Sequence, residues 1–132
     1  MNCANPNKYA NAGDDESFSF SQKDICVKTP RRCDECGTSI PAGETHERTL
    51  CRLQEDSAHI TFRTCRVCQS IRDVFFYDYT HGLVIDNLRD YLEDCPLQLI
   101  PEGYMASLTL DARTRVFDMI EKIEAERRIK ND

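Results

Sequence analysis

Apolar side chains recur at helical spacing in three stretches of the chain: residues 65–79, 84–95 and 110–129. Residues three and four positions apart lie on one face of a helix, so each stretch predicts an amphipathic helix with one buried side. Gly82 follows the first stretch and Pro96 follows the second, and neither residue readily continues a helix. We expect residues 97–105 to form a connecting loop with buried apolar anchors at Leu99 and Ile100.

Alternating apolar and polar positions predict strands before the helices. Residues 45–53 and 58–64 show the period of two that a half-buried strand requires. The polar residues between them, which include Glu55 and Asp56, are typical of a hairpin tip. These stretches therefore predict an antiparallel β-hairpin directly before the first helix.

The pattern divides the chain into three parts. We expect residues 1–24 to be a poorly ordered or docking N-terminal segment. Within it, Phe18 and Phe20 alternate with serines, which indicates either a short edge strand or a tail that docks on the domain. Residues 25–82 hold the hairpin and the first helix, and residues 83–132 form a C-terminal helical lobe that packs on them.

Two Cys-x-x-Cys pairs bracket the hairpin. They are Cys33 with Cys36 and Cys65 with Cys68. Four thiolates are the ligand set of a tetrahedral structural zinc site. Gly37 follows the first pair, and a positive φ there lets backbone N–H groups point back at the sulfurs. The four cysteines therefore predict one structural Zn²⁺.

The second pair stands at the start of the first predicted helix. Thr64 is the predicted N-cap, which puts both sulfurs in the first turn, where the helix dipole favours the thiolate. A knuckle at the first pair, a β-hairpin and a helix carrying the last two ligands make a treble-clef zinc finger. The predicted fold is therefore α+β, a treble clef backed by two further α-helices. Three other residues of the hairpin are interpreted as ordinary strand residues: His46, Cys51 and His59.

Charge favours a protein partner over nucleic acid. The formal net charge is −6: residues 1–32 carry five basic and four acidic side chains, residues 33–82 five and eight, and residues 83–132 seven and eleven. Neutralising phosphates supplies most of the affinity for nucleic acid, whereas an acidic protein suits a partner with a basic surface. The hairpin is a local exception, with arginines that are either a basic patch or a solvated strand face: Arg48, Arg52 and Arg63.

Two acidic groups are candidate partner-binding surfaces, and each of their residues is alternatively a solvated charge. The first is the acidic face of the second helix, with Asp86, Asp90, Glu93 and Asp94. The second is the hairpin tip, with Glu55 and Asp56. The long last helix also offers a surface for pairing with a second copy of the chain, so a homodimer stays open.

The sequence predicts no membrane span. Residues 1–8 lack the apolar run of a signal peptide, and no stretch of about 18 apolar residues occurs. We therefore expect a cytoplasmic, reducing location, where paired cysteines bind metal rather than form disulfides.

Three motifs carry a resemblance to a known group of proteins. They are Cys33-x-x-Cys36-Gly37, the turn Ile40-Pro41-x-Gly43-Glu44, and Thr64-Cys65-x-x-Cys68 followed by x-x-Ile71-Arg72-Asp73. In them the chain resembles small treble-clef zinc proteins encoded by bacteriophages and prophages, and the similarity continues into the helix around 87–92. It covers residues 26–95. Treble clefs recur across unrelated functions, so the resemblance implies a zinc site and a phage accessory protein, without a defined activity.

In a phage context, the resemblance implies a host protein as partner and the bacterial host cytoplasm as location. We expect a non-enzymatic, zinc-stabilised accessory protein that inhibits a host defence complex, in the manner of an anti-CRISPR that covers a basic surface. The acidic charge agrees with this expectation. A nucleic-acid-binding regulator that uses the zinc-finger hairpin is the alternative.

An HNH-like nuclease is the remote alternative. Such enzymes place a Cys-x-x-Cys pair at a treble-clef helix, but they also need a His general base, a second metal-binding His and an orienting Asn. His59 lies in a predicted strand, yet neither His nor Asn follows Cys68 at the helix. A zinc deaminase is disfavoured because Thr64 stands where its signature has a proline. We therefore expect no enzymatic activity.

Overall fold

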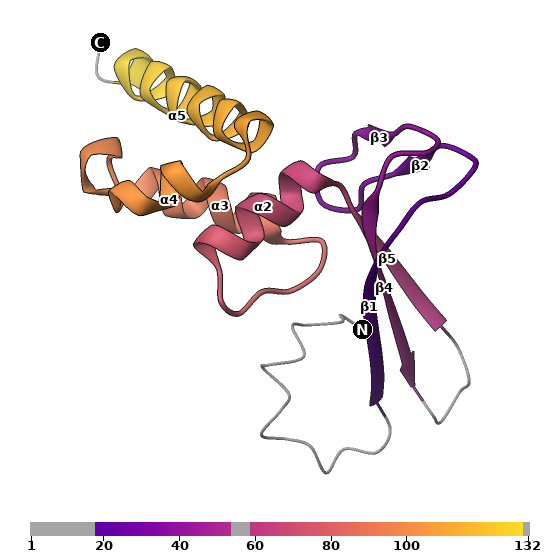
Figure 1. Ribbon diagram of the computed structural model, residues 1–132. Coiled ribbons are helices and arrows are strands. Elements are labelled where there is room, and N and C mark those ends of the chain that lie inside the picture. Colours follow the sequence, from indigo (N-terminus) through magenta and orange to yellow (C-terminus); the bar gives the residue numbers. More distant parts are fainter. Residues whose placement is uncertain (1–17, 54–58, 131–132) are drawn as a thin grey trace.

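Five strands precede all the helices in the described part of the chain. The computed structural model describes residues 18–53 and 59–130, and within them it is a mixed α+β structure (Figure 1). The strands are β1 (Phe18–Ile25), β2 (Arg31–Arg32), β3 (Ser39–Ile40), β4 (His46–Leu53) and β5 (His59–Thr64). The helices are α2 (Arg66–Phe75), α3 (Val84–Asp94), the 3₁₀ turn η2 (Leu97–Leu99), α4 (Glu102–Ser107) and α5 (Leu110–Lys130). None of these helices combines the length and the apolar character needed to cross a membrane.

The larger sheet has the strand order β1-β4-β5 and is antiparallel throughout. β4 and β5 form the hairpin that the alternating pattern predicts. β1 pairs with the full length of β4, from Phe18 opposite Leu53 to Ile25 opposite His46. Of the two alternatives for Phe18 and its neighbours, the structure therefore has the edge strand, and the expected boundary after residue 24 falls inside β1.

Two parts of the sequence predictions lie outside the described residues. The first is residues 1–17, which make up most of the expected N-terminal segment. The second is the hairpin tip with the candidate partner-binding residues Glu55 and Asp56.

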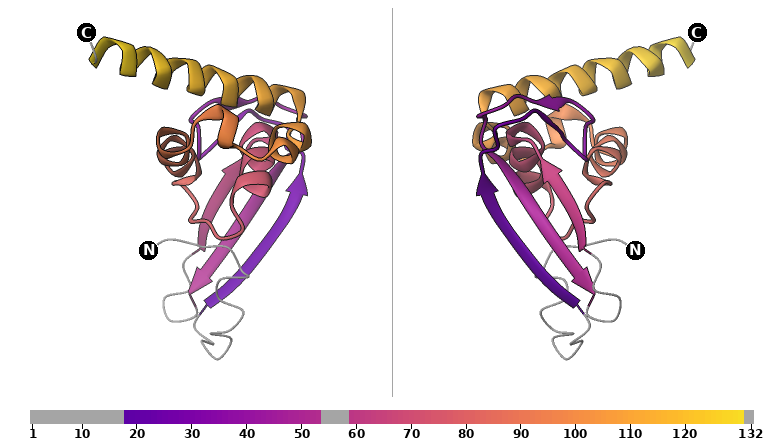
Figure 2. Two further views of the ribbon diagram at one scale, coloured as in Figure 1. Left: turned by 90° about the vertical axis from the view of Figure 1, so that its left-hand side faces the viewer. Right: turned by 90° about the vertical axis from the view of Figure 1, so that its right-hand side faces the viewer.

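The described helices lie on one side of the larger sheet, toward the end where the smaller sheet also lies (Figures 1 and 2). We call the face toward them the covered face and the opposite face the open face. On β4, the alternate residues Glu47, Thr49 and Cys51 are buried, and their face meets α2. The right-hand view of Figure 2 looks onto the opposite face, where no helix of the described chain lies. The smaller sheet, which pairs β2 with β3, sits beside one end of the larger one (Figure 1).

The main core lies between α2, α3 and α5. Its fully buried side chains come from one face of each helix and include Ile71, Val84, Leu88, Leu92, Ala112, Val116, Ile120 and Ile123. These are the faces that helical spacing predicts. A smaller cluster joins Cys33, Ile40 and Cys68, and Ile85 of α3 packs against both clusters. The cysteine cluster and the helical core therefore share a side chain.

The predicted end of the first helix is wrong. α2 ends at Phe75 rather than at Tyr79, because Phe76 takes an extended conformation with φ −129° and ψ 114°. Tyr79 is nevertheless buried, at 6% exposure. The prediction extended the helix to Tyr79 because Gly82 is the first stop signal in the sequence.

The expected loop at residues 97–105 is also wrong. It contains η2 and most of α4, so three α-helices follow α2 in the described chain instead of two. Leu99, expected to be buried, is 68% exposed, whereas Ile100 is buried as expected. A helix of six residues is too short to show a periodic pattern, so spacing alone misses α4.

Candidate metal centre

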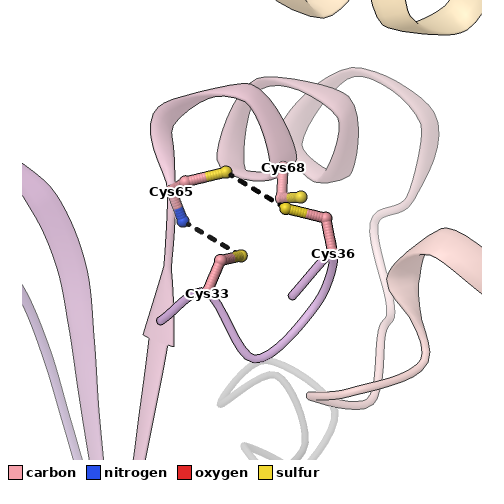
Figure 3. Close-up of side chains that lie close together, drawn as sticks. All are labelled: Cys33, Cys36, Cys65 and Cys68. Atoms are coloured by element: carbon pink, nitrogen blue, oxygen red, sulfur yellow. Dashed lines mark hydrogen bonds between the residues drawn. The ribbon is translucent and has the colours of Figure 1, made fainter. Parts of the chain in front are cut away.

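The four predicted ligand cysteines lie together beside the start of α2 (Figure 3). Their sulfur atoms all lie within 4.8 Å of one another. Cys33 and Cys68 are buried, while Cys36 and Cys65 are half-buried. Thiolates about 2.3 Å from a tetrahedral Zn²⁺ are roughly 3.8 Å from each other, and Cys36 Sγ lies 3.8 Å from Cys65 Sγ. The donor set and this spacing fit a small, thiophilic cation in tetrahedral coordination.

A tight turn between β2 and β3, the knuckle, holds the first pair. The Cys33 amide donates to the Thr38 carbonyl over 2.9 Å, and the Gly37 amide donates to the Cys33 carbonyl over 2.9 Å. Gly37 has φ +76°, which a side chain would strain, so the turn needs glycine there. Arg32 Nε donates to the Gly37 carbonyl over 2.9 Å. The arginine that precedes the pair therefore braces the backbone of the knuckle.

Polar hydrogens surround the sulfurs as the sequence predicts. The amides of Glu35 and Cys65 each lie 3.4 Å from Cys33 Sγ. Cys36 Sγ donates to the Thr38 hydroxyl over 3.2 Å. The two amides stabilise negative charge on Cys33 Sγ. Because the Cys65 amide belongs to the second pair, its contact also joins the two halves of the cluster.

Thr64 is not the N-cap of the first helix. It is the last residue of β5, and its hydroxyl is buried with no hydrogen-bond partner among the described residues. Cys65 is the N-cap, with φ −69° and ψ 165°, and its carbonyl accepts the Gln69 amide over 2.9 Å. The prediction fails because the sheet pairing of Thr64 with Glu47 keeps Thr64 extended. Cys68 still lies in the first turn of α2, near the positive end of the helix dipole.

Crowding makes the four thiols share their protons unequally. Contact with Cys36 raises the pKa of the Cys33 thiol. Contacts with Cys65 and Cys68 lower this pKa by more, so that it falls to about 6. Hydrogen bonds from the other three sulfurs lower the pKa of Cys36. Hydrogen bonds to Cys33 and Cys36 raise the pKa of Cys65, and contacts with the other three sulfurs raise the pKa of Cys68. A metal ion bound by all four sulfurs would displace the protons that remain on them.

Glu35, inside the first Cys-x-x-Cys pair, connects the knuckle to α3. Its Oε1 accepts the Val84 amide over 3.0 Å and its Oε2 accepts the Gly82 amide over 2.8 Å. Val84 is the first residue of α3, so the carboxylate caps the positive end of that helix. Burial raises the pKa of Glu35, although the two amides and the charge of Arg72 act in the opposite direction. Sequence reasoning misses this cap because the partners are 49 positions apart.

A buried ion pair joins α2 to the covered face of the sheet. Arg72 donates to both carboxylate oxygens of Glu47, over 2.5 and 2.7 Å, and the two side chains are 5% and 4% exposed. Burial lowers the pKa of Arg72, but the hydrogen bonds and the charge of Glu47 outweigh it and raise the pKa. The guanidinium also lies 4.5 Å from the centre of the Tyr79 ring. Gln22 of β1 donates to both Glu47 and Tyr79, so three elements meet here.

His81 fills the space between this ion pair and the Glu35 cap. Its ring stacks on Phe62 at 4.8 Å between ring centres and meets Tyr79 edge-on at 5.1 Å. Burial, followed by the charge of Arg72, lowers the pKa of His81 to about 4. A neutral, buried imidazole at neutral pH acts here as a packing group, and no spacing in the sequence indicates that role.

The candidate residues of α3 all lie at the surface. Asp86, Asp90, Glu93 and Asp94 are exposed, on the side of α3 away from the buried Leu88. No ion pair joins any of these four carboxylates to another described residue.

The other histidines and cysteines do not enlarge the cluster among the described side chains. His46 Nδ1 lies 3.3 Å from the Glu44 carbonyl, and its Nε2 accepts a hydrogen bond from Arg63 over 2.9 Å. Both ring nitrogens of His46 therefore have partners other than a metal. The side chain of His59 lies outside the described residues, and Cys26 and Cys95 are free thiols outside the cluster. Cys51 is disulfide-bonded, which corrects its interpretation as an ordinary strand residue.

Comparison with known proteins leaves the family of the chain open. The candidate metal centre rests on its four sulfurs and on the donors around them. No protein-family model, no curated protein and no solved structure matches the chain.

Proposed function

We propose that Cys33, Cys36, Cys65 and Cys68 bind one structural Zn²⁺, and that the knuckle, the β4–β5 hairpin and α2 form a treble clef around it. A set of four thiolates suits Zn²⁺ better than the oxygen-seeking cations Mg²⁺ and Ca²⁺. Four protein ligands close the coordination shell, so no position stays open for water or substrate. The order of knuckle, hairpin and helix along the chain supports the treble clef.

On this scaffold, we propose a non-enzymatic accessory protein whose helix α3 docks on a basic protein surface. The observation that carries this proposal is a set of exposed carboxylates on α3 that form no ion pair with the described residues: Asp86, Asp90, Glu93 and Asp94. The cap from Glu35 holds the start of α3 to the knuckle, so the carboxylates are presented in one orientation. Complementary charge speeds association and selects among partners.

The resemblance to phage-encoded treble-clef proteins directs the search for this partner to the bacterial host. A host defence complex carries a basic surface where it holds nucleic acid. An acidic helix that covers such a surface inhibits the complex by competition, as an anti-CRISPR does. The proposed place of action is then the bacterial cytoplasm.

The test is affinity capture with the tagged protein from a nuclease-treated bacterial lysate. We expect a stoichiometric host protein that survives nuclease and that elutes as salt is raised, because salt screens surface charges. Converting the four α3 carboxylates to amides (Asp86→Asn, Asp90→Asn, Glu93→Gln and Asp94→Asn) should lower capture by at least about tenfold. The matched control changes the net charge equally at four other exposed positions: Glu44→Gln, Asp78→Asn, Glu121→Gln and Glu124→Gln.

Two outcomes would reject docking through α3. An equal loss of capture in both variants would show that net charge, and not this helix, decides binding. Loss of every partner on nuclease treatment would favour the nucleic-acid-binding regulator instead.

A further inference from the structure

A row of basic side chains crosses the open face of the larger sheet. Lys23 of β1 lies directly opposite Arg48 of β4, and Arg48 lies directly opposite Arg63 of β5. Directly opposed residues share one face of a sheet, and with strands about 4.8 Å apart the row spans about 10 Å. Glu47, next to Arg48, is buried and bonded to α2 on the other face. The row therefore lies on the face opposite the described helices, which is toward the viewer in the right-hand view of Figure 2.

Further positive charge accompanies this row. Arg52 is exposed two residues beyond Arg48, so it shares the face. Arg31 of β2 lies close enough to Arg63 for its charge to lower the pKa of Arg63. We define the basic sheet face as Lys23, Arg48, Arg52 and Arg63, with Arg31 at its edge. The other positions of this face with described side chains are uncharged or neutral: Ser21, Ile25, His46, Leu50 and Thr61.

The cations of the basic sheet face form no ion pair with any carboxylate of the described residues. The Asp34 carboxylate lies at the edge of this face, where it accepts the backbone amide of Arg63 over 2.6 Å. Arg48 Nε is buried and has no hydrogen-bond partner among the described residues. Arg63 donates to His46 Nε2 over 2.9 Å, and this acceptor neutralises no charge.

Like charges held close together, with an orphaned donor among them, favour a bound anion. Each guanidinium repels its neighbours, and a buried N–H without an acceptor costs free energy. An anion that bridges Arg48 and Arg63 relieves the repulsion between their guanidinium groups. Phosphate suits the planar, forked donors of arginine especially well.

We propose that the basic sheet face binds the phosphodiester backbone of a nucleic acid without reading its sequence. Ser21 and Thr61 lie opposite Leu50, which is between Arg48 and Arg52 on this face of β4, and their hydroxyls are further phosphate donors. An acidic protein segment is the weaker fit, because protein interfaces depend on aromatic and apolar anchors. Apart from Leu50 and Ile25, this face offers none among its described side chains. The proposal is separate from docking through α3, which uses a different surface of opposite charge.

The acidity of the whole chain limits the affinity of this face. The net charge of −6 repels phosphate at long range, whereas the basic sheet face attracts it at contact. Three phosphate contacts predict a slope of about −2 when the logarithm of the affinity is plotted against the logarithm of the salt concentration, for a single strand. Binding is therefore expected at low salt and lost as salt rises.

The test is fluorescence anisotropy of the full chain with a labelled single-stranded DNA of mixed sequence and about 20 nucleotides, at salt concentrations from about 50 mM upward. The variant Lys23→Gln/Arg48→Gln/Arg52→Gln should bind at least about tenfold more weakly and lose most of the salt dependence. The matched control Arg89→Gln/Lys122→Gln/Arg128→Gln removes the same charges from exposed positions on α3 and α5 and should bind like the wild type.

Several results would overturn the proposal. They are no binding at the lowest salt, an equal loss in the control variant, or displacement of the DNA by polyglutamate as readily as by unlabelled DNA of equal charge. Circular dichroism and metal content establish that the variants fold. If the triple variant does not fold, the single variants Arg52→Gln and Arg128→Gln are compared instead. Arg52→Gln should lower the affinity for the DNA by about threefold, and Arg128→Gln should leave it unchanged. Because the α3 capture experiment uses nuclease-treated lysate, either proposal can fail without the other.

Discussion

Single cysteines determine whether the region around the knuckle has a core at all. Cys33 and Cys68 make up most of the small buried cluster there, and Ile40 is its one fully buried aliphatic side chain. So little apolar burial does not fold a lobe by itself. With the proposed zinc site, the free energy of metal binding becomes free energy of folding, as it does in small metal-dependent domains.

We therefore expect Cys36→Ser or Cys65→Ser to abolish tight zinc binding and to unfold the knuckle and the start of α2. Each substitution removes one of four ligands and leaves three crowded sulfurs without a closed shell. The measurement is metal content per chain together with the dispersion of the NMR spectrum. Cys26→Ser is the control, because Cys26 is an exposed free thiol outside the cluster and its loss should leave one zinc per chain. A Cys36→Ser protein that stays folded with a substoichiometric metal content would contradict the structural role.

The sequence reveals these cysteines but not the residues that support them. A Cys-x-x-Cys pair is a local pattern, readable within four positions. Thr64 and Glu35 are different, because their roles depend on partners elsewhere. Thr64 has the composition of an N-cap, yet pairing with Glu47 keeps it in the strand, and Glu35 finds its partners at Gly82 and Val84.

At the scale of elements, α3 depends on the knuckle for its position, because Glu35 of the knuckle caps its first residue. Its N-cap position is Leu83, whose side chain cannot accept a hydrogen bond, and its first amide is satisfied by Glu35 instead. The spacing of Val84, Leu88 and Leu92 predicts that α3 exists, but not what caps it. The same limit explains α4, which is too short for its period to be seen.

We expect Glu35→Ala to lower the free energy of unfolding by about 1–2 kcal/mol and to loosen the start of α3. The reason is that two backbone amides, one of them at the fully buried Val84, lose their acceptor. Hydrogen exchange of the amides at residues 82–88 measures the local effect, and chemical denaturation measures the total. Glu35→Gln keeps one acceptor oxygen and should lose less.

Glu44→Ala is the matched control for this cap, since it removes an exposed carboxylate from the turn after β3. Its exchange rates at residues 82–88 should equal those of the wild type. Unchanged protection of these amides in Glu35→Ala would show that another group caps α3.

At the scale of the whole molecule, positive and negative side chains lie on different surfaces, which the net charge does not show. The net charge of −6 hides a face of the sheet on which the described residues carry only positive charge. Lys23, Arg48 and Arg63 come from three different strands, and only the antiparallel register puts them in one row. The sequence singles out the hairpin arginines but cannot add Lys23, because the pairing partner of a strand is not encoded locally.

The buried ion pair Arg72–Glu47 joins the sheet to the helices. Arg72→Met or Glu47→Gln alone should each lower the free energy of unfolding by about 3–5 kcal/mol, because each leaves the partner buried without its counter-charge or full hydrogen bonding. The double variant should cost much less than the sum of the two, with a coupling of at least about 2 kcal/mol in a double-mutant cycle by chemical denaturation.

The exposed pair Arg66–Asp24 is the matched control, since it too joins α2 to the sheet, over 3.3 Å, with side chains 42% and 51% exposed. Its coupling should stay below about 1 kcal/mol, because water screens it. If Arg72 and Glu47 were additive like the surface pair, the buried ion pair would add nothing specific to the attachment of α2 to the sheet. A large coupling for the buried pair beside a small one for the exposed pair would instead identify it as a specific polar link between the two layers.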